Sequence, residues 1–581
     1  MAIIGIDLGT TNSAMAYLKD GKPEIIPNKE GHRTTPSVFN INPKGEIQIG
    51  RVAKNAYPGS PDETVLEVKR LMGTGEKVKV AGKEFAPEEI SSFYLKYLKE
   101  SAEEALGETV TEAIITVPAY FSDTQRKATQ IAGQIAGMKV ERVINEPTAA
   151  AIAFGIENME EEANMLIYDL GGGTFDVSVV ELFAGVVQVK ASTGDNNLGG
   201  MDFDERLVQW LNKQVKHKHN IDLLNDGTEI ELKQRYARIK TEAENVKMSL
   251  SSSSTAQFNL PFIALKDGVP ISVMEEISRA EFEDLIKDLL DTTIKHVEKA
   301  LEEAKLNINE ITDVLLIGGS TRVPAVQKIV EQKFNKTARK DINPDEAVAL
   351  GAAIQGAIKT GEISANNGLM VVDVCPYSLG TEVSRIVGGQ IVSGFYDELI
   401  PANTPIPYKN TKIYNTMHDN QSNVAIGVYQ GDGTDVYVRE DLMVTKEKIE
   451  LDDIPAGPAG TQNISVTFEY DINGMLNIRA EILSTGKTIK SAINAQTGVM
   501  SAAEIQQATR KVAENWETSK LYAEVKPVIT RAERILMDVT EPERSKLENL
   551  LNELKTALSN NDEPTVRRLE DSLTDMLIEL V

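Results

Sequence analysis

Gly5-Ile-Asp-Leu-Gly-Thr-Thr-Asn-Ser13 stands near the start of the chain, and Tyr168-Asp-Leu-Gly-Gly-Gly-Thr-Phe-Asp176 repeats its pattern much later. Each stretch predicts a strand that ends in an aspartate, a tight turn rich in Gly and Thr, and a returning strand. Glycines let backbone N–H groups approach phosphate oxygens, and Thr hydroxyls add donors. The alternative is that these are two ordinary hairpins with glycine turns. The repetition of the pattern with both aspartates kept makes this alternative the weaker one.

The two aspartates of this repeat, Asp7 and Asp169, predict a metal ion. A carboxylate beside a triphosphate would only repel it unless a divalent cation lay between them. The cation expected is Mg²⁺, held largely through its water molecules. Two such turns on two similar lobes would hold one nucleotide between them.

Changes in the pattern of residues along the sequence divide the chain into four segments, which are 1–367, 368–375, 376–500 and 501–581. The first alternates short β-branched runs with longer helical stretches, which is typical of an α/β domain. Capping boxes at Ser122 and Ser278 predict helix starts. The apolar stripe from Phe282 to Leu301 predicts one long amphipathic helix after the second box.

Short strands separated by turn residues predict an antiparallel β domain over residues 376–500, with turns at Gly388-Gly389, Gly431-Asp432-Gly433 and Asn473-Gly474. From a capping box at Ser501 the chain is predicted to be helical to Val581. Three prolines predict a division of this end into short helices; they are Pro527, Pro542 and Pro564.

Between the first two domains lies the apolar run Leu369-Met-Val-Val-Asp373. A linker between domains is normally polar and solvated. We therefore expect this run to dock onto a neighbouring surface.

Composition excludes several classes of function. Of 581 residues, 41% are hydrophobic and 25% are charged, and 61 Lys and Arg against 87 Asp and Glu give a net charge of −26. This charge disfavours non-specific binding to nucleic acid or anionic membranes. One Cys and five His exclude a disulfide framework and a Cys-rich metal site. The start of the chain lacks a basic leader, and no apolar run approaches about 18 residues, so a cytoplasmic protein is expected.

Two further patterns resemble a nucleotide-binding or metal-binding motif but are not interpreted as sites. Ser484-Thr-Gly-Lys-Thr488 resembles the end of a Walker A loop, but Glu481 stands where that motif requires Gly, so a hairpin turn is predicted. His217 and His219 are two residues apart and would lie on different faces of a helix. A solvated surface explains them better than a metal site does.

Five motifs in order resemble the seventy-kilodalton heat-shock chaperones, the DnaK family. They are Gly5–Ser13, Ile115-Thr-Val-Pro-Ala-Tyr-Phe121, Ile144-Asn-Glu-Pro-Thr-Ala-Ala-Ala151, Tyr168–Asp176 and Gly318-Gly-Ser-Thr-Arg322. Within the family, Asp373-Val-Cys-Pro-Tyr-Ser-Leu-Gly380, Thr416-Met-His418 and the short helical end are most similar to the HscC-like branch of specialised bacterial chaperones.

The resemblance implies an α/β fold of three parts. These are a duplicated actin-like (ribonuclease H-like) two-lobed ATPase domain, an antiparallel β-sandwich that binds peptides, and a short helical lid. It implies an ATP-dependent chaperone that binds extended apolar peptide segments with an affinity gated by Mg-ATP binding and hydrolysis. The implied cofactors are ATP or ADP and Mg²⁺, with K⁺ as a further candidate. The implied partners in the bacterial cytoplasm are unfolded clients and a J-domain co-chaperone, with a nucleotide-exchange factor as a further candidate.

The resemblance also assigns residues to the ATP site. The catalytic set is Lys69, Glu146, Thr174 and Asp176. The set around the phosphates and Mg²⁺ is Asp7, Gly9, Thr10, Thr11, Asn12, Asp169, Gly171, Gly172, Gly199 and Gly200. The set around adenosine is Glu244, Lys247, Ser251, Gly318, Gly319, Ser320, Arg322 and Asp345. Taken alone, Lys69 or Lys247 could be a solvated helix lysine, and Glu244 and Lys247 could be an i,i+3 surface ion pair.

Two further sets follow from the same resemblance. The peptide-binding set is Thr381, Val383, Ser384, Tyr414, Met417, Val424, Ile426 and Ile464. The allosteric set is Pro118, Arg126, Arg142, Leu369, Val371 and Asp373, in which Arg142 matches a residue engaged by J-domain proteins. In the family, two side chains close an arch over the bound peptide, and the matching residues here are Ser384 and Met417. The large and the small residue have exchanged places, which leaves the chain direction of the bound client open. Val424 and Ile426 could instead be sandwich core.

Two other classes of function are alternatives on the same duplicated fold. A small-molecule or sugar kinase would need a polar acceptor pocket between the lobes. The second alternative class is a structural, actin-like filament protein. Neither class explains residues 376–581.

Overall fold

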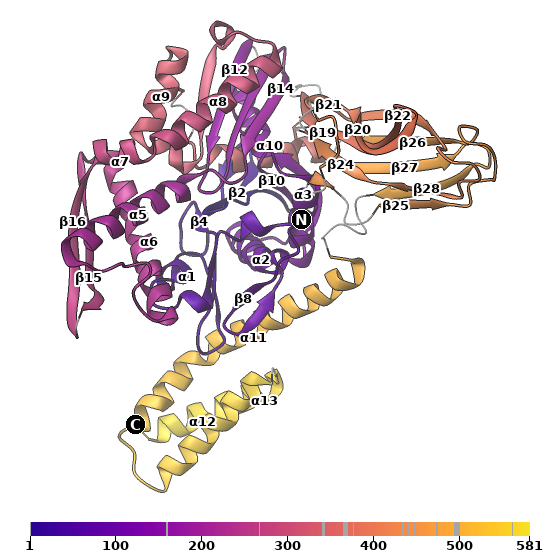
Figure 1. Cartoon of the computed structure of the whole chain (residues 1–581). Coiled ribbons are helices and arrows are strands. Elements are labelled where there is room, and N and C mark those ends of the chain that lie inside the picture. Colours follow the sequence, from indigo (N-terminus) through magenta and orange to yellow (C-terminus); the bar gives the residue numbers. More distant parts are fainter. Residues whose placement is uncertain are drawn as a thin grey trace.

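The computed structural model describes residues 2–158, 161–266, 268–339, 343–363, 370–375, 377–431, 435–439, 442–444, 448–471, 475–492, 500–560 and 562–580. In Figure 1 the first 360 or so residues form a large α/β body, with a β-rich body beside it and a helical arm below. Among the described residues, no helix is both long and apolar enough to cross a bilayer.

The first large sheet has the order β11-β10-β1-β2-β3, and β4 also pairs with β2. Its strands are β1 (Ala2–Asp7), β2 (Asn12–Lys19), β3 (Lys22–Ile25), β4 (Thr35–Pro36), β10 (Val110–Val117) and β11 (Lys139–Asn145). Strand β1 runs parallel to β10 and antiparallel to β2, so the first glycine turn joins β1 to β2 as the sequence predicts.

Smaller elements surround this first sheet. They are β5 (Val38–Ile41), β6 (Ile47–Ile49), α1 (Arg51–Ala56), β7 (Thr64–Leu66), β8 (Val78–Val80), β9 (Lys83–Phe85), α2 (Pro87–Leu106) and α3 (Asp123–Ile135). The predicted capping box forms at the start of α3, where the Ser122 side chain accepts a hydrogen bond from the Gln125 N–H.

The second large sheet has the order β17-β12-β13-β14-β18-β21. Its strands are β12 (Ala163–Leu170), β13 (Phe175–Phe183), β14 (Val186–Asp195), β17 (Asp313–Ile317), β18 (Met370–Cys375) and β21 (Thr404–Ile406). Strand β12 is antiparallel to β13 and parallel to β17, which repeats the relation of β1 to β2 and β10. The repeated sequence motif therefore corresponds to a repeated arrangement of strands.

Two helices rich in small residues, α4 (Glu146–Glu157) and α10 (Ala347–Thr360), join the two sheets through one apolar core. They approach so closely that a Cβ atom on Gly351 would lie 1.8 Å from the carbonyl oxygen of Ala149. A Cβ on Gly5 of β1 would likewise lie 2.2 Å from the backbone nitrogen of Ala353 in α10. Glycine at these positions sets the spacing between the sheets.

Further elements extend the second sheet. They are α5 (Gly200–His219), α6 (Glu229–Ser252), β15 (Thr255–Lys266), β16 (Val269–Ser278), α7 (Arg279–Leu285), α8 (Lys287–Ala304) and α9 (Pro324–Phe334). The capping box at Ser278 forms, but the expected single helix after it is wrong. Ile286, with φ −104° and ψ 3°, leaves helical geometry and separates α7 from α8.

The β-rich body contains the sheets β20-β19-β24, β22-β26-β27-β28 and β23-β25. Its strands are β19 (Ser378–Val387), β20 (Gln390–Ile400), β22 (Tyr408–Asn415), β23 (Asn423–Ile426), β24 (Val428–Gly431), β25 (Ile449–Asp452), β26 (Asn463–Tyr470), β27 (Leu476–Ile482) and β28 (Lys487–Ala492).

The predicted hairpins of this body form where the chain is described. Gly388 and Gly389 join β19 to β20, and Gly486, with φ 71°, lies in the turn from β27 to β28. Strands β26 and β27 pair as predicted, although their turn at Asn473-Gly474 lies outside the described residues. Asp432 and Gly433 of the other predicted turn also lie outside them.

The helical arm contains α11 (Ala502–Ile535), α12 (Glu543–Ser559) and α13 (Glu563–Glu579). Pro542 and Pro564 stand at the starts of α12 and α13, but the predicted break at Pro527 is wrong because α11 continues through it. A proline inside a helix costs about 3 kcal/mol or more. Buried side chains on both sides of it, including Val525 and Ile529, pack against α12 and α13 and offset this cost.

The first half of α11 lies along the first large sheet's helices (Figure 1). The Trp516 ring stands 6.2 Å from that of Phe93 on α2, and its Nε1–H donates to Glu100 at 2.8 Å. Lys511 pairs with Glu89 at 2.9 Å. The arm is therefore docked on the α/β body.

The apolar linker docks as expected. Met370, Val371 and Val372 of β18 lie parallel to Val186–Gln188 of β14, and the other half of β18 pairs with β21. This strand thus ties the β-rich body to the second large sheet. Leu369 lies outside the described residues.

The close approach of α10 to α4 gives a stability prediction. Gly351→Ala places a methyl group against backbone atoms that cannot move independently, and overpacking of this kind costs about 1–3 kcal/mol. Gly356→Ala in the same helix is the control, because its Cβ would meet only side-chain atoms, of Ile3 at 3.1 Å and of Ile114 at 3.7 Å. Urea unfolding followed by circular dichroism should show a lower midpoint for the first variant only, and equal midpoints would contradict the packing argument.

Candidate functional site

A cavity of about 350 Å³ opens between the two large sheets. It is bordered by the ends of β1, β12 and β17, by α6, and by the start of α10. Nineteen of the residues predicted for the ATP site line it: Asp7, Gly9, Thr10, Thr11, Asn12, Lys69, Glu146, Asp169, Gly171, Gly172, Thr174, Glu244, Lys247, Ser251, Gly318, Gly319, Ser320, Arg322 and Asp345. The fold thus brings residues from seven separate parts of the sequence to one cavity.

The two glycine turns face and touch each other in this cavity. A Cβ on Gly172 would lie 1.8 Å from Thr11 Oγ1, so the second turn needs glycine to approach the first. Thr11 Oγ1 is buried and has no hydrogen-bond partner among the described residues. A buried hydroxyl without a partner is costly unless something else in the cavity binds it.

Three predicted residues lie behind the cavity wall instead of lining it. Gly199 and Gly200 support the second turn: the Gly200 N–H donates to the Gly171 carbonyl at 3.0 Å, and a Cβ on Gly199 would lie 2.5 Å from Gly172. Asp176, opposite Asp169 in the β12–β13 pair, is only 1% exposed. Its carboxylate accepts a hydrogen bond from the Tyr120 N–H at 3.0 Å.

Acidic side chains outnumber basic ones at the base of the cavity. Lys69 Nζ contacts Glu146 at 2.6 Å, and both are buried. Burial, followed by repulsion from Glu146, raises the pKa of Asp7 and of Asp176 to about 7 each. The pKa of Asp169 is raised by the same two causes. Four carboxyl groups around one lysine leave the cluster short of positive charge.

The opposite wall comes from α6 and from the loops after β17 and before α10. Ser320 donates to the Gly171 carbonyl at 2.8 Å, and Arg322 pairs with Asp345 at 2.6 Å. Glu244 and Lys247 do not pair with each other. Lys247 instead pairs with Asp204 at 2.8 Å, and Glu244 pairs with a residue of the first sheet's periphery.

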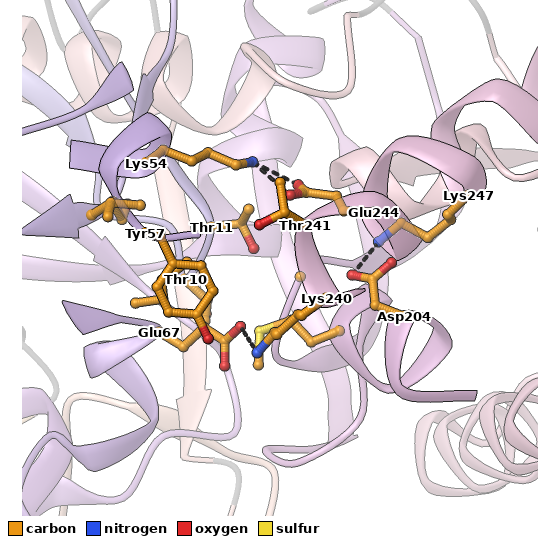
Figure 2. Close-up of a pocket in the computed structure, with 15 residues that line it drawn as sticks. Thr10, Thr11, Lys54, Tyr57, Glu67, Asp204, Lys240, Thr241, Glu244 and Lys247 are labelled. Carbon is orange, nitrogen blue, oxygen red and sulfur yellow. Dashed lines mark hydrogen bonds and ion pairs between the residues drawn. The ribbon is translucent and has the colours of Figure 1, made fainter. Parts of the chain in front are cut away.

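Figure 2 shows that periphery facing α6 across a second, smaller cavity of about 50 Å³. Lys54 of α1 meets Glu244 at 2.7 Å, and Glu67, after β7, meets Lys240 at 2.7 Å. Both pairs join the two halves of the α/β body. The pKa of Lys240 is raised, because the attraction of Glu67 and other neighbours outweighs burial, which alone would lower it.

Sequence reasoning did not find these bridging residues. Lys54, Glu67 and Lys240 carry no local motif, and their partners lie far away in the chain. Arg70 was also missed; it pairs with Asp202 at 2.9 Å and donates to the Gly173 carbonyl at 2.7 Å. Its position next to Lys69, a predicted ATP-site residue, was the one sequence feature that could have indicated it.

The predicted peptide-binding residues gather in the β-rich body. Thr381, Val383 and Ser384 lie on β19, Tyr414 on β22, Val424 and Ile426 on β23, and Ile464 on β26, with Met417 after β22. Ile426 and Ile464 belong to the apolar core, and Tyr414 and Val424 pack against it. The Tyr414 hydroxyl donates to Asp397 at 2.8 Å.

The predicted allosteric residues connect α3 to the docked linker. Arg126 donates to the side chain of Asn145 at 2.5 Å, and Asn145 donates to Asp373 of β18 at 3.0 Å. Arg142 faces Asp373, and burial lowers its pKa. Val371 lies opposite Val187 in the strand pair, and Pro118 begins the loop between β10 and α3.

Within the described part of the chain, no group of three or more His, Cys, Asp or Glu side chains is arranged to hold a metal ion. Asp7 and Asp169 therefore stand as two carboxylates at a cavity and not as part of a closed metal cage.

Comparison with known proteins gives the family. A sequence model described as "Hsp70 protein" matches residues 3–79 and 74–579. The chain is 42% identical to the Chaperone protein DnaK of Thermotoga neapolitana, across 98% of this chain and 95% of the relative. The same protein of Thermotoga petrophila and of Thermotoga maritima is 41% identical across the same shares. The chain belongs to the Hsp70 family of ATP-dependent, ATP-hydrolysing chaperones.

Proposed function

We propose that Mg-ATP binds in the cavity between the two sheets, and that its hydrolysis sets the affinity of the β-rich body for extended apolar peptides. The observation that carries this proposal is the pair of touching glycine turns, with Asp7 and Asp169 at the same cavity. Backbone N–H groups of such turns bind phosphate oxygens. The family's ATPase activity supplies the reaction.

The residues fit a Mg²⁺ ion that is held largely through water. The carboxylates of Asp7 and Asp169 lie in a cluster that lacks positive charge, and the unpartnered Thr11 hydroxyl offers a further polar contact. When bound, the ion would neutralise charge on the phosphates. K⁺ is proposed as a further candidate cofactor from the resemblance alone.

Phosphoryl transfer depends mainly on positioning and charge stabilisation. We assign Lys69 to the γ-phosphate, since it is the one cationic side chain in the acidic cluster described above. Glu146, Asp176 and Thr174 hold the attacking water and the second turn. The α6 residues, Gly318–Ser320, Arg322 and Asp345 hold the adenosine.

The segments of the chain are proposed to have separate roles. Residues 1–367 form a two-lobed, actin-like ATPase domain, 368–375 the linker, 376–500 a β-sandwich that binds clients, and 501–581 a short lid. The motif around Asp373 favours the HscC-like branch. A J-domain co-chaperone at Arg142, a nucleotide-exchange factor and a bacterial cytoplasmic location are proposed from the resemblance.

The linker strand is the proposed route between the two activities. Full burial of an apolar side chain of this size stabilises by about 1.5–3 kcal/mol, and allosteric couplings are typically about 1–3 kcal/mol. One docked strand thus has an energy of the required size. The hydrogen-bonded series from Arg126 through Asn145 to Asp373 joins that strand to the first sheet.

The main test is peptide release in a linker variant. Val371→Asp places a charge in the β14–β18 contact, so it should abolish the loss of a labelled apolar peptide on adding ATP, while ATP binding and peptide binding with ADP persist. Fluorescence anisotropy with each nucleotide measures this. Met370→Asp is the matched control, because Met370 is 62% exposed in the same strand and should release peptide normally. Normal release by Val371→Asp would refute the coupling, and phosphorylation of a metabolite without peptide binding would favour a kinase.

Removal of the lysine in the acidic cluster tests the ATP site. Lys69→Ala should lower single-turnover ATP hydrolysis by about 10²-fold, the usual effect of deleting one charge-stabilising group. ATP affinity, measured by calorimetry, should fall far less. Lys22→Ala, at an exposed lysine of β3, is the control. Unchanged hydrolysis in Lys69→Ala would remove this residue from the mechanism.

The bridging ion pairs predict the rate of nucleotide release. Lys240→Ala breaks a half-buried pair between the two halves of the ATPase body, so release of a fluorescent ADP should quicken several-fold. Lys233→Ala, whose pair with Asp62 is exposed, is the matched control and should change little. Equal rates in both variants and the unmodified chain would show that the pairs do not hold the cavity closed.

A further inference from the structure

The hairpin of β19 and β20 extends beyond the sheet to which it belongs. Strand β24 pairs with β19 only from Ser378 to Thr381, and the segment 435–439 reaches β20 at Gly394. Within the described part of the chain, residues 385–392 therefore pair only with one another. They form a two-stranded tip whose edges no other described strand covers.

Four β-branched side chains of this tip face solvent. Ile386 and Val387 are 70% and 51% exposed, and Ile391 and Val392 are 41% and 36% exposed. An isolated two-stranded hairpin is only marginally stable in water, and its β-branched side chains are stabilised by packing against neighbours. The tip thus presents apolar surface that the described residues leave uncovered.

One face of the tip continues the position predicted for the arch over the client. Ser384 Oγ lies 2.8 Å from Ser393 Oγ, so these two side chains share a face. Side chains alternate along a strand, so Ile386 and Ile391, which pair across the hairpin, lie on that same face. We call this the isoleucine face; Val387 lies on the opposite one. At about 3.3 Å per residue, the pair is about 7 Å from Ser384.

The opposite face carries the charge of the tip. Arg385 is the one charged residue among residues 385–392, and it alternates with Ile386. Its guanidinium lies 4.9 Å from the centroid of the Phe395 ring, which stacks on Tyr437. The isoleucine face is therefore uncharged, which suits an apolar partner because no charge loses its water on contact.

Three occupants of the isoleucine face can be compared. The buried apolar residues of the helical arm pack on the first sheet's core and within the arm's own bundle. A second copy of the chain would bring one net charge of −26 against another, which opposes association. An extended apolar peptide has neither disadvantage, and its backbone conformation matches a strand-like surface.

We propose that Ile386 and Ile391 form a second contact for the client, outside the predicted pocket, which binds an apolar side chain that flanks the segment under the arch. The β-rich body then selects clients over a longer apolar stretch than one pocket would read. This inference rests on the proposed binding of extended apolar peptides by the β-rich body.

The test compares two labelled peptides with the same apolar centre, one flanked by Ile and Val and the other by Ser and Gly. In fluorescence anisotropy with ADP, the unmodified full chain should bind the first about three- to tenfold more tightly, as burial of about half an isoleucine side chain implies. The double variant Ile386→Ser, Ile391→Ser should lose this preference while binding the polar-flanked peptide as before. A preference that persists in the double variant would overturn the proposal.

A matched control separates contact from hairpin stability. Val387→Ser removes an exposed β-branched side chain from the opposite face of the same tip, so the preference should remain. An equal loss in this variant would mean that a weakened hairpin is the cause, against the proposal. Sedimentation velocity tests the second copy: a dimer of the unmodified chain that dissociates in the double variant would assign the face to self-association instead.

The same titrations distinguish the two levels of argument. If the unmodified chain binds neither peptide, the proposed peptide-binding function of the β-rich body fails. If it binds both, and the double variant binds each with unchanged affinity, only the contact at Ile386 and Ile391 is refuted.

Discussion

The contact on which the rest of the molecule depends is the meeting of two glycine turns above a buried acidic cluster. Asp7, Asp169, Asp176 and Glu146 lie together with one lysine, and burying so much like charge is costly. The packing of α4 on α10 holds the two sheets close enough to keep these groups together, through backbone contacts that only glycine and alanine permit. Small residues that do not themselves line the cavity thereby fix its geometry.

The parts of the chain that bound the cavity are also joined by polar contacts outside it. Ion pairs across the smaller cavity join α6 to the first sheet's periphery, and the β-rich body adds bonds at Tyr120, Asp123 and Asp373. These bonds are polar, and the β-rich body has its own apolar core. The two sheets of the α/β body, in contrast, also share the apolar core of α4 and α10. Docking and release of the bodies therefore need not disturb their cores.

Local signals explain most of what the sequence could predict. The glycine turns, the capping boxes at Ser122, Ser278 and Ser501, and the hairpins depend on a few neighbouring residues, and each forms where it is described. Nineteen of the predicted ATP-site residues also line one cavity. The wrong predictions concern helix continuity, which local sequence did not decide. Pro527 stays helical because its neighbours are buried in a bundle, and Ile286 interrupts a helix without a local signal. The partners of Lys54 and Lys240 could not be inferred, because ion pairs between distant segments leave no periodic pattern.

The continuity of α11 through Pro527 has a mechanical meaning. With 34 residues at 1.5 Å each, the helix is a rod about 50 Å long. The Trp516 ring holds it against α2 near the middle of its length, and its far half forms the bundle with α12 and α13. A tilt of about 10° at Trp516 would move the far end, roughly 29 Å away, by roughly 5 Å. A small tilt of α11 on α2 would thus displace the whole C-terminal bundle, with the helix as a lever.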